Sequence, residues 1–199
     1  MSGRRFVALF SDIGGVLGTN GWDTELRLRI ANHFGCDHHE IQSRHRLMFD
    51  SYERGYLSFE EYIKAVFCER DWREVRDYAY EQSVAWPENI ALLRETKEKN
   101  GLKLALISNE GEGLTEHRVR KFGLREVADF MVFSHFVHLR KPDREMWKLA
   151  LQLAQASAAE SVYIDDRPMF VDIAVGLGFS AIHHTAVEST RAALESLGL

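Results

Sequence analysis

Four separated segments of the sequence carry side chains that can act on a charged substrate. They supply Asp12, Ser108, Lys141 and the pair Asp165–Asp166, each at the end of an apolar run or just before a helix. Ligands of parallel α/β sheets bind outside the carboxyl ends of the strands, so we expect these side chains on one rim. Carboxylates that meet at one point repel unless a cation neutralises them, and Mg²⁺ prefers oxygen ligands. The sequence therefore predicts a Mg²⁺ site at this rim.

The same residue types suit chemistry on a phosphate ester. An aspartate carboxylate can attack phosphorus and form an acyl-phosphate that water then cleaves, and Asp12 is our candidate for this role. Ser108 and Lys141 would bind the other phosphoryl oxygens and stabilise negative charge in the transition state. The Gly14–Gly15 turn would let backbone N–H groups approach the same oxygens, because glycine has no side chain in the way.

Five apolar segments predict the sheet that holds these residues. The predicted strands cover residues 6–10, 102–107, 130–133, 162–164 and 180–183. The predicted helices of the same region cover residues 87–100, 114–122, 144–156, 171–177 and 187–197. Continuous apolar runs suit strands that are covered on both faces. Because strands alternate with helices, we expect an α/β fold: a Rossmann-like parallel sheet with helices on both faces.

Residues 18–86 have a different pattern, with many charged and aromatic residues, helical periodicity and no strand signal. Ser58-Phe59-Glu60-Glu61 matches the capping box that begins a helix, and Gly55 separates this helix from the one before it. A further helix is predicted over residues 71–86. We therefore expect a small helical cap domain (18–86) inserted after the first strand of a core domain (1–17 and 87–199).

The composition is that of an ordinary globular protein, with 45% hydrophobic and 28% charged residues in 199. The net charge of −5, without a basic stripe, argues against a nucleic-acid partner. The apolar run at residues 6–10 is too short for a signal peptide or a membrane span. Cys36 and Cys68 form no C-x-x-C pair, so we expect free thiols, no zinc and a cytoplasmic location. The expected partner is a small phosphorylated metabolite, and no pattern specifies an oligomeric state.

Four short motifs in order give the chain a resemblance to the haloacid dehalogenase-like (HAD) hydrolases over essentially its whole length. They are Phe10–Leu17, Leu106–Asn109, Arg140–Asp143 and Val162–Asp166. Each motif is weak alone, but each stands at a predicted strand end or helix start. The helical insertion resembles the C1 type of cap in this family. Its Tyr52–Ser58 stretch, with Trp86–Glu88 at the return, resembles the sugar-phosphate phosphatase branch, with α-D-glucose-1-phosphate phosphatase as the nearest kind of relative.

The resemblance implies a Mg²⁺-dependent phosphatase and a role for each motif residue. Asp12 would be the nucleophile and a metal ligand, and Lys141 would orient this nucleophile and bind phosphate. The phosphate-binding residues would be Gly14, Gly15, Ser108, Asn109 and Lys141. The metal ligands would be Asp12, Asp166 and the carbonyl of Gly14, with Asp165 either a further ligand or a support for the others.

Gly14 departs from the family pattern. Phosphatases of this family usually carry an aspartate there, which protonates the leaving group and then activates water; such help contributes about 10²–10⁴-fold. Three explanations are open. The leaving group departs easily, or the substrate or cap supplies the proton; the enzyme is slow; or the chain binds its ligand without catalysis. We expect retained but modest activity. Smaller departures are His138 where the family often has glycine, and Phe170 where it often has asparagine.

Two other functions stay open at this stage. A 2-haloacid dehalogenase, in which Asp12 attacks carbon, would need neither a metal nor a proton for the departing halide. A degenerate HAD-fold binding protein would keep the pocket with little catalysis. Intact Asp12, Lys141 and Asp166 argue against the second alternative.

Several residues are candidates for choosing the substrate. Arg167 follows the acidic pair and is a weaker candidate for contact with a substrate anion. The candidates from the cap are Trp22, Arg44, His45, Phe49 and Tyr52. The alternative for the aromatic members is that they pack the small bundle.

Overall fold

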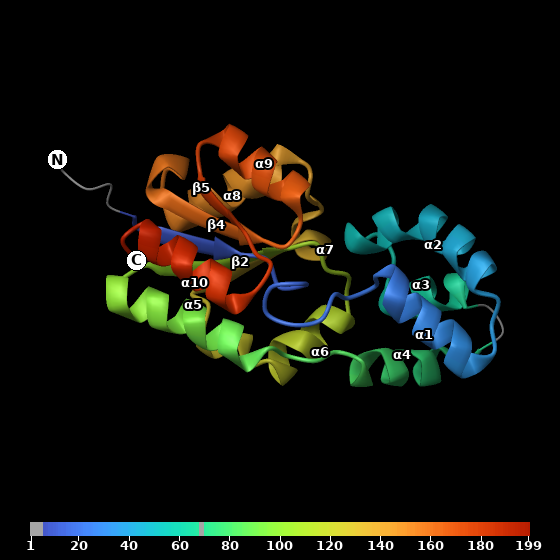
Figure 1. The fold of residues 1–199 in the computed structure, drawn as a ribbon. Helices are drawn as coiled ribbons and strands as arrows, with labels where there is room; N and C mark the ends of the chain where they lie inside the picture. Colours follow the sequence, from blue (N-terminus) through green and yellow to red (C-terminus); the bar gives the residue numbers. More distant parts are fainter. Residues whose placement is uncertain (1–5, 68–69) are drawn as a thin grey trace.

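A parallel five-stranded sheet lies at the centre of the core (Figure 1). The computed structural model describes residues 6–67 and 70–199. The strands are β1 (Ala8–Ser11), β2 (Lys103–Ser108), β3 (Phe130–Phe133), β4 (Ser161–Asp165) and β5 (Ser180–His183). They pair in the order β3-β2-β1-β4-β5, and each pairing is parallel. Because β1 is the central strand, the residue that follows it, Asp12, emerges in the middle of the carboxyl edge.

Helices cover both faces of the sheet, because alternate side chains of each strand point to opposite sides. Leu9, Leu104 and Ile164 pack with one group of helices, α5 (Pro87–Asn100), α6 (Leu114–Lys121) and α10 (Val187–Ser196). Phe10 and Tyr163 pack with the other, α8 (Arg144–Ala154) and α9 (Pro168–Leu177). Figure 1 shows α8 and α9 above the sheet and α5 and α10 below it. The expected α/β, Rossmann-like fold is confirmed.

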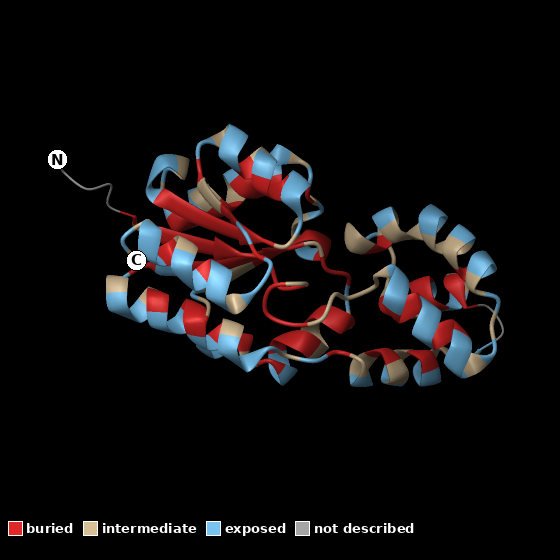
Figure 2. Ribbon diagram, viewed as in Figure 1, coloured by how far each residue is buried: buried red, intermediate tan, exposed pale blue. Residues whose placement is uncertain are grey.

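The insertion after β1 consists of four helices with their own core. They are α1 (Thr24–Phe34), α2 (His38–Glu53), α3 (Phe59–Val66) and α4 (Trp72–Glu81). Leu26, Tyr62 and Val75 belong to a cluster of buried residues separate from both clusters of the sheet. Figure 2 shows the buried residues on the inner sides of these helices. The predicted capping box begins α3: Ser58 Oγ accepts from Glu61 N and Glu61 Oε2 accepts from Ser58 N.

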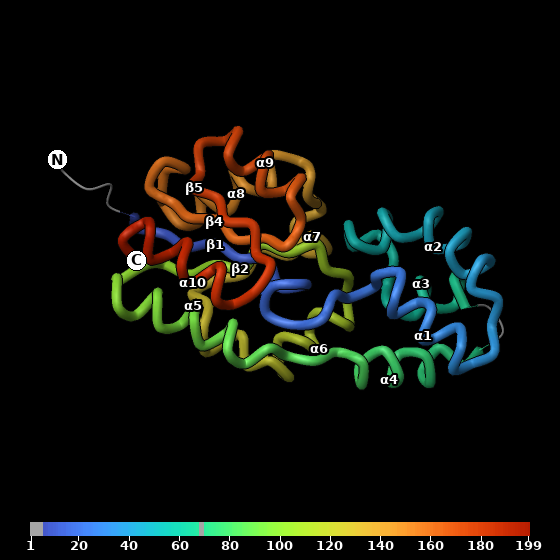
Figure 3. The backbone as a smooth tube through the Cα atoms, viewed as in Figure 1, coloured from blue at the N-terminus to red at the C-terminus, as the bar shows by residue number. Residues whose placement is uncertain are grey.

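Two linkers join the cap to the core and run side by side (Figure 3). Gly18 and Ala85 form an antiparallel bridge, and Trp86 N donates to Leu17 O over 2.9 Å. The helix predicted over residues 71–86 therefore ends early, at Glu81. The peptide groups that would have continued it bond to the outgoing linker instead, as in Thr19 N to Val84 O at 2.9 Å.

Smaller differences from the predicted elements follow from local chemistry. The helix expected from residue 171 begins at Pro168, because proline is preset for the first helical position. The helix expected to end at residue 156 ends at Ala154, where Gln155 adopts a left-handed φ of 53°. Short helical turns that the sequence did not predict are η1 (Leu124–Glu126), α7 (Ser134–Val137) and η2 (Ala158–Glu160).

Two expectations concern single features of the chain. Cys36 is a free, half-buried thiol, and Cys68 lies outside the described residues. No helix in the described parts of the chain is long and apolar enough to cross a membrane.

Candidate active site

Asp12 is a buried carboxylate at the end of the central strand, with only 6% of its surface exposed. Its Oδ1 accepts hydrogen bonds from Ser108 Oγ at 2.6 Å and from Ile13 N at 2.8 Å. Its Oδ2 lies 2.9 Å from Lys141 Nζ. Burial raises the pKa of Asp12, and Lys141 and Ser108 oppose this rise. Residues from two distant segments, together with the N–H of the following residue, thus hold this carboxylate in one orientation.

Lys141 is the cation at the centre of the site, and its ammonium is fully enclosed. Besides Asp12 it contacts Asp165 Oδ2 at 2.7 Å and the Tyr163 hydroxyl at 3.2 Å. Burial alone would lower the pKa of Lys141, but Asp12 and Asp165 outweigh it and raise this pKa. The lysine is therefore charged and fixed in place.

Asp165 uses both of its oxygens on partners within the protein. Oδ2 accepts from Lys141 and, at 2.5 Å, from Tyr163 Oη, while Oδ1 accepts from Arg167 N at 2.9 Å. This bonding lets Asp165 orient Lys141, while its role as a further metal ligand stays a prediction.

Asp166 has the features of a cation ligand. Its Oδ1 is buried and has no hydrogen-bond partner among the described residues, and a buried polar atom without a partner is costly. Burial, followed by the charges of Asp12 and Asp165, raises the pKa of Asp166 to about 6. Asp12, Asp165 and Asp166 each offer an oxygen within 4.8 Å of the others. This oxygen-only donor set fits Mg²⁺.

Gly15 lets Asp166 come this close to the first loop. A Cβ at Gly15 would lie 2.1 Å from Asp166 Oδ2, and its φ of +70° also favours glycine. The Gly15 N–H donates to Gly18 O at 2.9 Å. The sequence suggested phosphate binding by this N–H, but the structure directs it to the loop itself. Gly14, by contrast, lines a cavity between the core and the cap.

Asn109 lies beside Lys141, and its side chain holds the lysine's backbone. Asn109 Nδ2 donates to Lys141 O at 2.8 Å, and Lys141 N donates to Asn109 Oδ1 at 2.7 Å. The carboxamide thus positions Lys141, and because Nδ2 carries a second N–H and Asn109 lines the cavity, its role in phosphate binding stays a prediction. Ser108, by contrast, reaches Asp12 directly.

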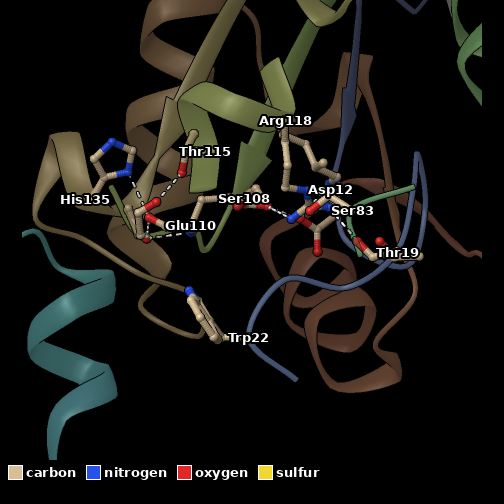
Figure 4. A network of polar contacts seen from close by, with 12 residues as sticks. Asp12, Thr19, Trp22, Ser83, Ser108, Glu110, Thr115, Arg118 and His135 are labelled. Carbon is tan, nitrogen blue, oxygen red and sulfur yellow. Dashed lines mark hydrogen bonds and ion pairs between the residues drawn. The ribbon is translucent and has the colours of Figure 1, made fainter. Parts of the chain in front are cut away.

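Glu110 and Arg118 form a buried ion pair that sequence reasoning missed. Arg118 Nη1 lies 2.5 Å from Glu110 Oε1, and Arg118 Nη2 donates to Thr19 O at 2.6 Å. Burial raises the pKa of Glu110, with Arg118 acting against it. Figure 4 shows Ser108 between Asp12 and Glu110 in this network. Glu110 could have been predicted as a site residue because it directly follows Ser108-Asn109. No local sequence pattern predicts that Arg118 reaches the site.

A cavity of about 260 Å³ opens above these groups, between core and cap. Of the five cap candidates, Trp22, His45 and Phe49 line it. The other two do not. Arg44 lines a different pocket and pairs with Glu40, and Tyr52 is buried in the cap, where its hydroxyl donates to Glu112 O at 2.6 Å. Arg44 and Tyr52 therefore bond to other parts of the protein and do not face the cavity.

Charged residues that the sequence did not single out complete the cap side of the cavity. Arg27 is 5% exposed and bonds to Trp22 O, Thr24 and Gln42. Glu53 pairs with Arg140 of the core at 2.6 Å. Burial and then the charge of Arg27 lower the pKa of His45 to about 3, so this imidazole is neutral. Arg167 is exposed and lines the same cavity.

The two smaller motif departures also have structural partners. Phe170 packs against Lys141, whose Nζ lies 5.0 Å from the ring centroid. His138 adopts a φ of 57°, and its Nδ1 lies 2.6 Å from Arg54 O. The His138 side chain therefore adds a contact between core and cap to the hydrogen bond that its backbone carbonyl accepts from Arg54 Nη1 at 3.1 Å.

A family model described as haloacid dehalogenase-like hydrolase matches residues 24–182. The chain belongs to this family. The match includes the cap helices and the segments that carry Ser108, Lys141 and Asp166. Among curated proteins, the haloacid dehalogenase-like hydrolase domain-containing protein 3 of Bos taurus is 41% identical over 68 residues, or 34% of this chain. The aligned part is 27% of that bovine protein.

Solved structures of HAD proteins share the fold. A HAD family enzyme from Bacteroides thetaiotaomicron, in complex with magnesium and inorganic phosphate, has a TM-score of 0.77 at 21% identity, covering 91% of this chain and 95% of that one. A HAD-like hydrolase from Porphyromonas gingivalis gives 0.71 at 20% identity, covering 89% and 90%. A defluorinating L-2-haloacid dehalogenase gives 0.65 at 15% identity, covering 96% and 95%. At these identities the likeness concerns the fold.

Proposed function

We propose that this HAD hydrolase is a Mg²⁺-dependent phosphatase that hydrolyses a small phosphate monoester through an aspartyl-phosphate on Asp12. One observation carries the proposal. The Asp12 carboxylate is held by Ser108 at 2.6 Å and Lys141 at 2.9 Å, next to an Asp166 oxygen that has no partner among the described residues. A nucleophile and an anion-binding cation thus meet at one cavity, and a cation-seeking carboxylate has an oxygen within 4.8 Å of the nucleophile.

In the first step, Asp12 attacks phosphorus and the bond to the leaving oxygen breaks, with its electron pair going to that oxygen. Lys141 stabilises the charge on the phosphoryl oxygens, and Ser108 keeps Asp12 aligned for attack. Asp12, Asp166 and the Gly14 carbonyl would hold Mg²⁺, which would supply Lewis-acid charge neutralisation at the phosphoryl group. In the second step, water attacks phosphorus, which frees Asp12 and releases inorganic phosphate.

The finer assignment is a sugar phosphate as substrate and a cap of the C1 type. Support comes from the four-helix insertion directly after β1 and from its polar lining, with Arg27, His45 and Glu53 at the cavity. The Bacteroides thetaiotaomicron relative was crystallised with magnesium and phosphate, which agrees with phosphoryl chemistry.

The test is turnover of a panel of sugar phosphates with Mg²⁺ by the wild type and by Asp12→Asn. We expect Asp12→Asn to lower kcat by about 10³-fold or more, because a removed nucleophile has no substitute. Asp172→Asn, an exposed position on α9, is the matched control and should leave kcat unchanged. The proposal fails if no ester is hydrolysed and the two variants behave alike.

The same preparation distinguishes the two alternatives. Chloride release from a 2-haloacid that persists in EDTA would indicate a dehalogenase. Calorimetry that shows Mg²⁺ and phosphate binding without any turnover would indicate a binding protein.

A further inference from the structure

Asn20 takes the place of a side chain that Gly14 lacks. A Cβ built on Gly14 would lie 2.8 Å from Asn20 Oδ1, closer than real side chains approach. Both residues line the cavity that contains Asp12 and Ser108. The wall next to the nucleophile is thus a carboxamide that comes from the linker to the cap.

The Asn20 backbone is held in place while its carboxamide is available. Both backbone groups of the preceding residue are held: Thr19 N donates to Val84 O at 2.9 Å, and Thr19 O accepts from Arg118 Nη2 at 2.6 Å. Among the described residues no donor or acceptor bonds to the Asn20 carboxamide, whereas both ends of the Asn109 carboxamide are occupied. Asn20 therefore presents an amide with unused hydrogen-bonding capacity to the cavity.

The position of Asn20 relates it to one atom of a phosphate ester. Ser108 and Lys141 lie at the core end of the cavity, and Trp22 and His45 line its cap end. Asn20 is in the linker between these ends. If an ester binds with its phosphate at the core end and its organic group at the cap end, we expect the oxygen that joins them to lie between these ends, near Asn20.

We propose that the Asn20 carboxamide, turned about its terminal torsion so that Nδ2 takes the place of Oδ1 beside Gly14, donates a hydrogen bond from Nδ2 to this bridging oxygen as it leaves. The inference rests on the phosphatase function proposed above. As Asp12 forms its bond to phosphorus, the bond to the bridging oxygen breaks and the electron pair passes to that oxygen. Asn20 stabilises the developing alkoxide but does not ionise, so water supplies the proton and hydroxide is left behind.

This assignment defines a substrate class. Without a proton donor at the leaving oxygen, the rate depends steeply on how acidic the departing alcohol is. The protein should therefore prefer esters of acidic alcohols, such as aryl phosphates and phosphates on the anomeric carbon of a sugar, over simple alkyl phosphates.

The experiment measures kcat/KM with Mg²⁺ for a series of aryl and alkyl phosphates whose alcohols differ in pKa. Asn20→Ala should steepen the dependence on the alcohol's pKa, because the poorest leaving groups lose most stabilisation. Asn20→Asp should flatten it and raise alkyl phosphate turnover at least about tenfold relative to aryl phosphates, since general acid help is worth about 10²–10⁴-fold. Asn32→Ala, exposed on α1, is the control.

Unchanged dependence on the leaving group in both Asn20 variants overturns the inference while leaving the phosphatase function intact. A purely structural Asn20 would lower all rates equally. If the wild type hydrolyses no ester, the proposed phosphatase function is wrong. Whether Asn20 contacts a bound phosphoryl group is then tested by measuring ligand affinity. Vanadate, which mimics the transferring phosphoryl group, should then bind to Asn20→Ala at least about fivefold more weakly than to the wild type by calorimetry, a loss typical of one hydrogen bond; equal binding refutes the inference.

The steric relation between the two positions gives an additional check. Gly14→Asp alone must move the Asn20 carboxamide aside, because a Cβ at this position would lie 2.8 Å from Asn20 Oδ1, so we expect its carboxyl to be poorly placed. Gly14→Asp combined with Asn20→Gly makes room for a carboxyl at the same place, and we expect it to hydrolyse alkyl phosphates faster than Gly14→Asp alone. Equal activity of the single and double variants would show that Asn20 does not occupy this space.

Discussion

The two ends of the cavity are built in different ways. At the core end, Asp12, Lys141 and Asp165 come from distant segments and bond mainly to one another. At the cap end, Arg27 and His45 bond to cap neighbours such as Gln42 and Tyr62. The reactive groups thus depend on the whole sheet for their positions, whereas the groups that face the substrate's organic part are supported locally. We therefore expect core substitutions to affect kcat and cap substitutions to affect KM.

The largest expected effect is at Lys141. Lys141→Met leaves the buried Asp12 and Asp165 carboxylates unpaired, which typically costs about 3–5 kcal/mol of stability. It should also lower kcat by about 10²–10³-fold, because charge stabilisation in the transition state is lost. Steady-state kinetics and thermal melting measure the two effects. Lys148→Met, which breaks an exposed pair with Glu145, is the control and should change neither. If Lys141→Met kept the wild-type kcat, the expectation that core substitutions lower kcat would be wrong.

A smaller effect is expected at Gly15, where an added Cβ would meet the cation ligand Asp166. In Gly15→Ala the new methyl group must displace Asp166, so Mg²⁺ affinity should fall about 10–100-fold, as for other disrupted supports of metal ligands. Calorimetric Mg²⁺ titration measures this. Gly101→Ala is a matched control, because Gly101 has a similar φ of +64° but open space around it. An equal loss of Mg²⁺ affinity in both variants would point to backbone strain alone.

The pH dependence of Mg²⁺ binding follows from Asp166. Its pKa is raised from 3.8 to about 6 in the folded protein. Between these values the metal-free folded protein binds more protons than the unfolded chain, so its stability falls as pH rises through this window. Mg²⁺ requires the ionised carboxylate, so its affinity should decrease by up to about tenfold per pH unit below pH 6. Titrations at several pH values test this, and a Mg²⁺ affinity that stays constant between pH 6 and pH 3.8 would contradict it.

The smallest expected effect is at the cap. Glu53→Gln keeps the size of the side chain but weakens its pair with Arg140. We expect KM to change by about three- to tenfold, the scale of one hydrogen bond, with kcat unaltered. Glu60→Gln, which alters an exposed pair with Lys64, serves as control. A fall in kcat instead would mean that the cap end also aligns the reacting groups.

The sequence predicted those features that depend on short stretches of chain. Apolar runs located the strands, and the residues just after them, Asp12, Ser108 and Asp166, do meet at one rim. Features set by distant partners escaped this reasoning. Arg118 reaches Glu110 and the Thr19 carbonyl, and the segment after Glu81 pairs with the outgoing linker rather than continuing its helix. No local pattern encodes such contacts, because the partner determines them.

The paired linkers have a consequence for how this molecule can be altered. The backbone leaves the sheet at Leu17 and returns at Trp86, and a hydrogen bond of 2.9 Å joins these residues. The chain therefore leaves and re-enters the core at adjacent residues, and removal of the insertion would leave two ends that a tight turn can join. We therefore expect that a different helical segment can replace this insertion. Such an exchange should alter which substrates are accepted while Asp12 and Lys141 keep their positions.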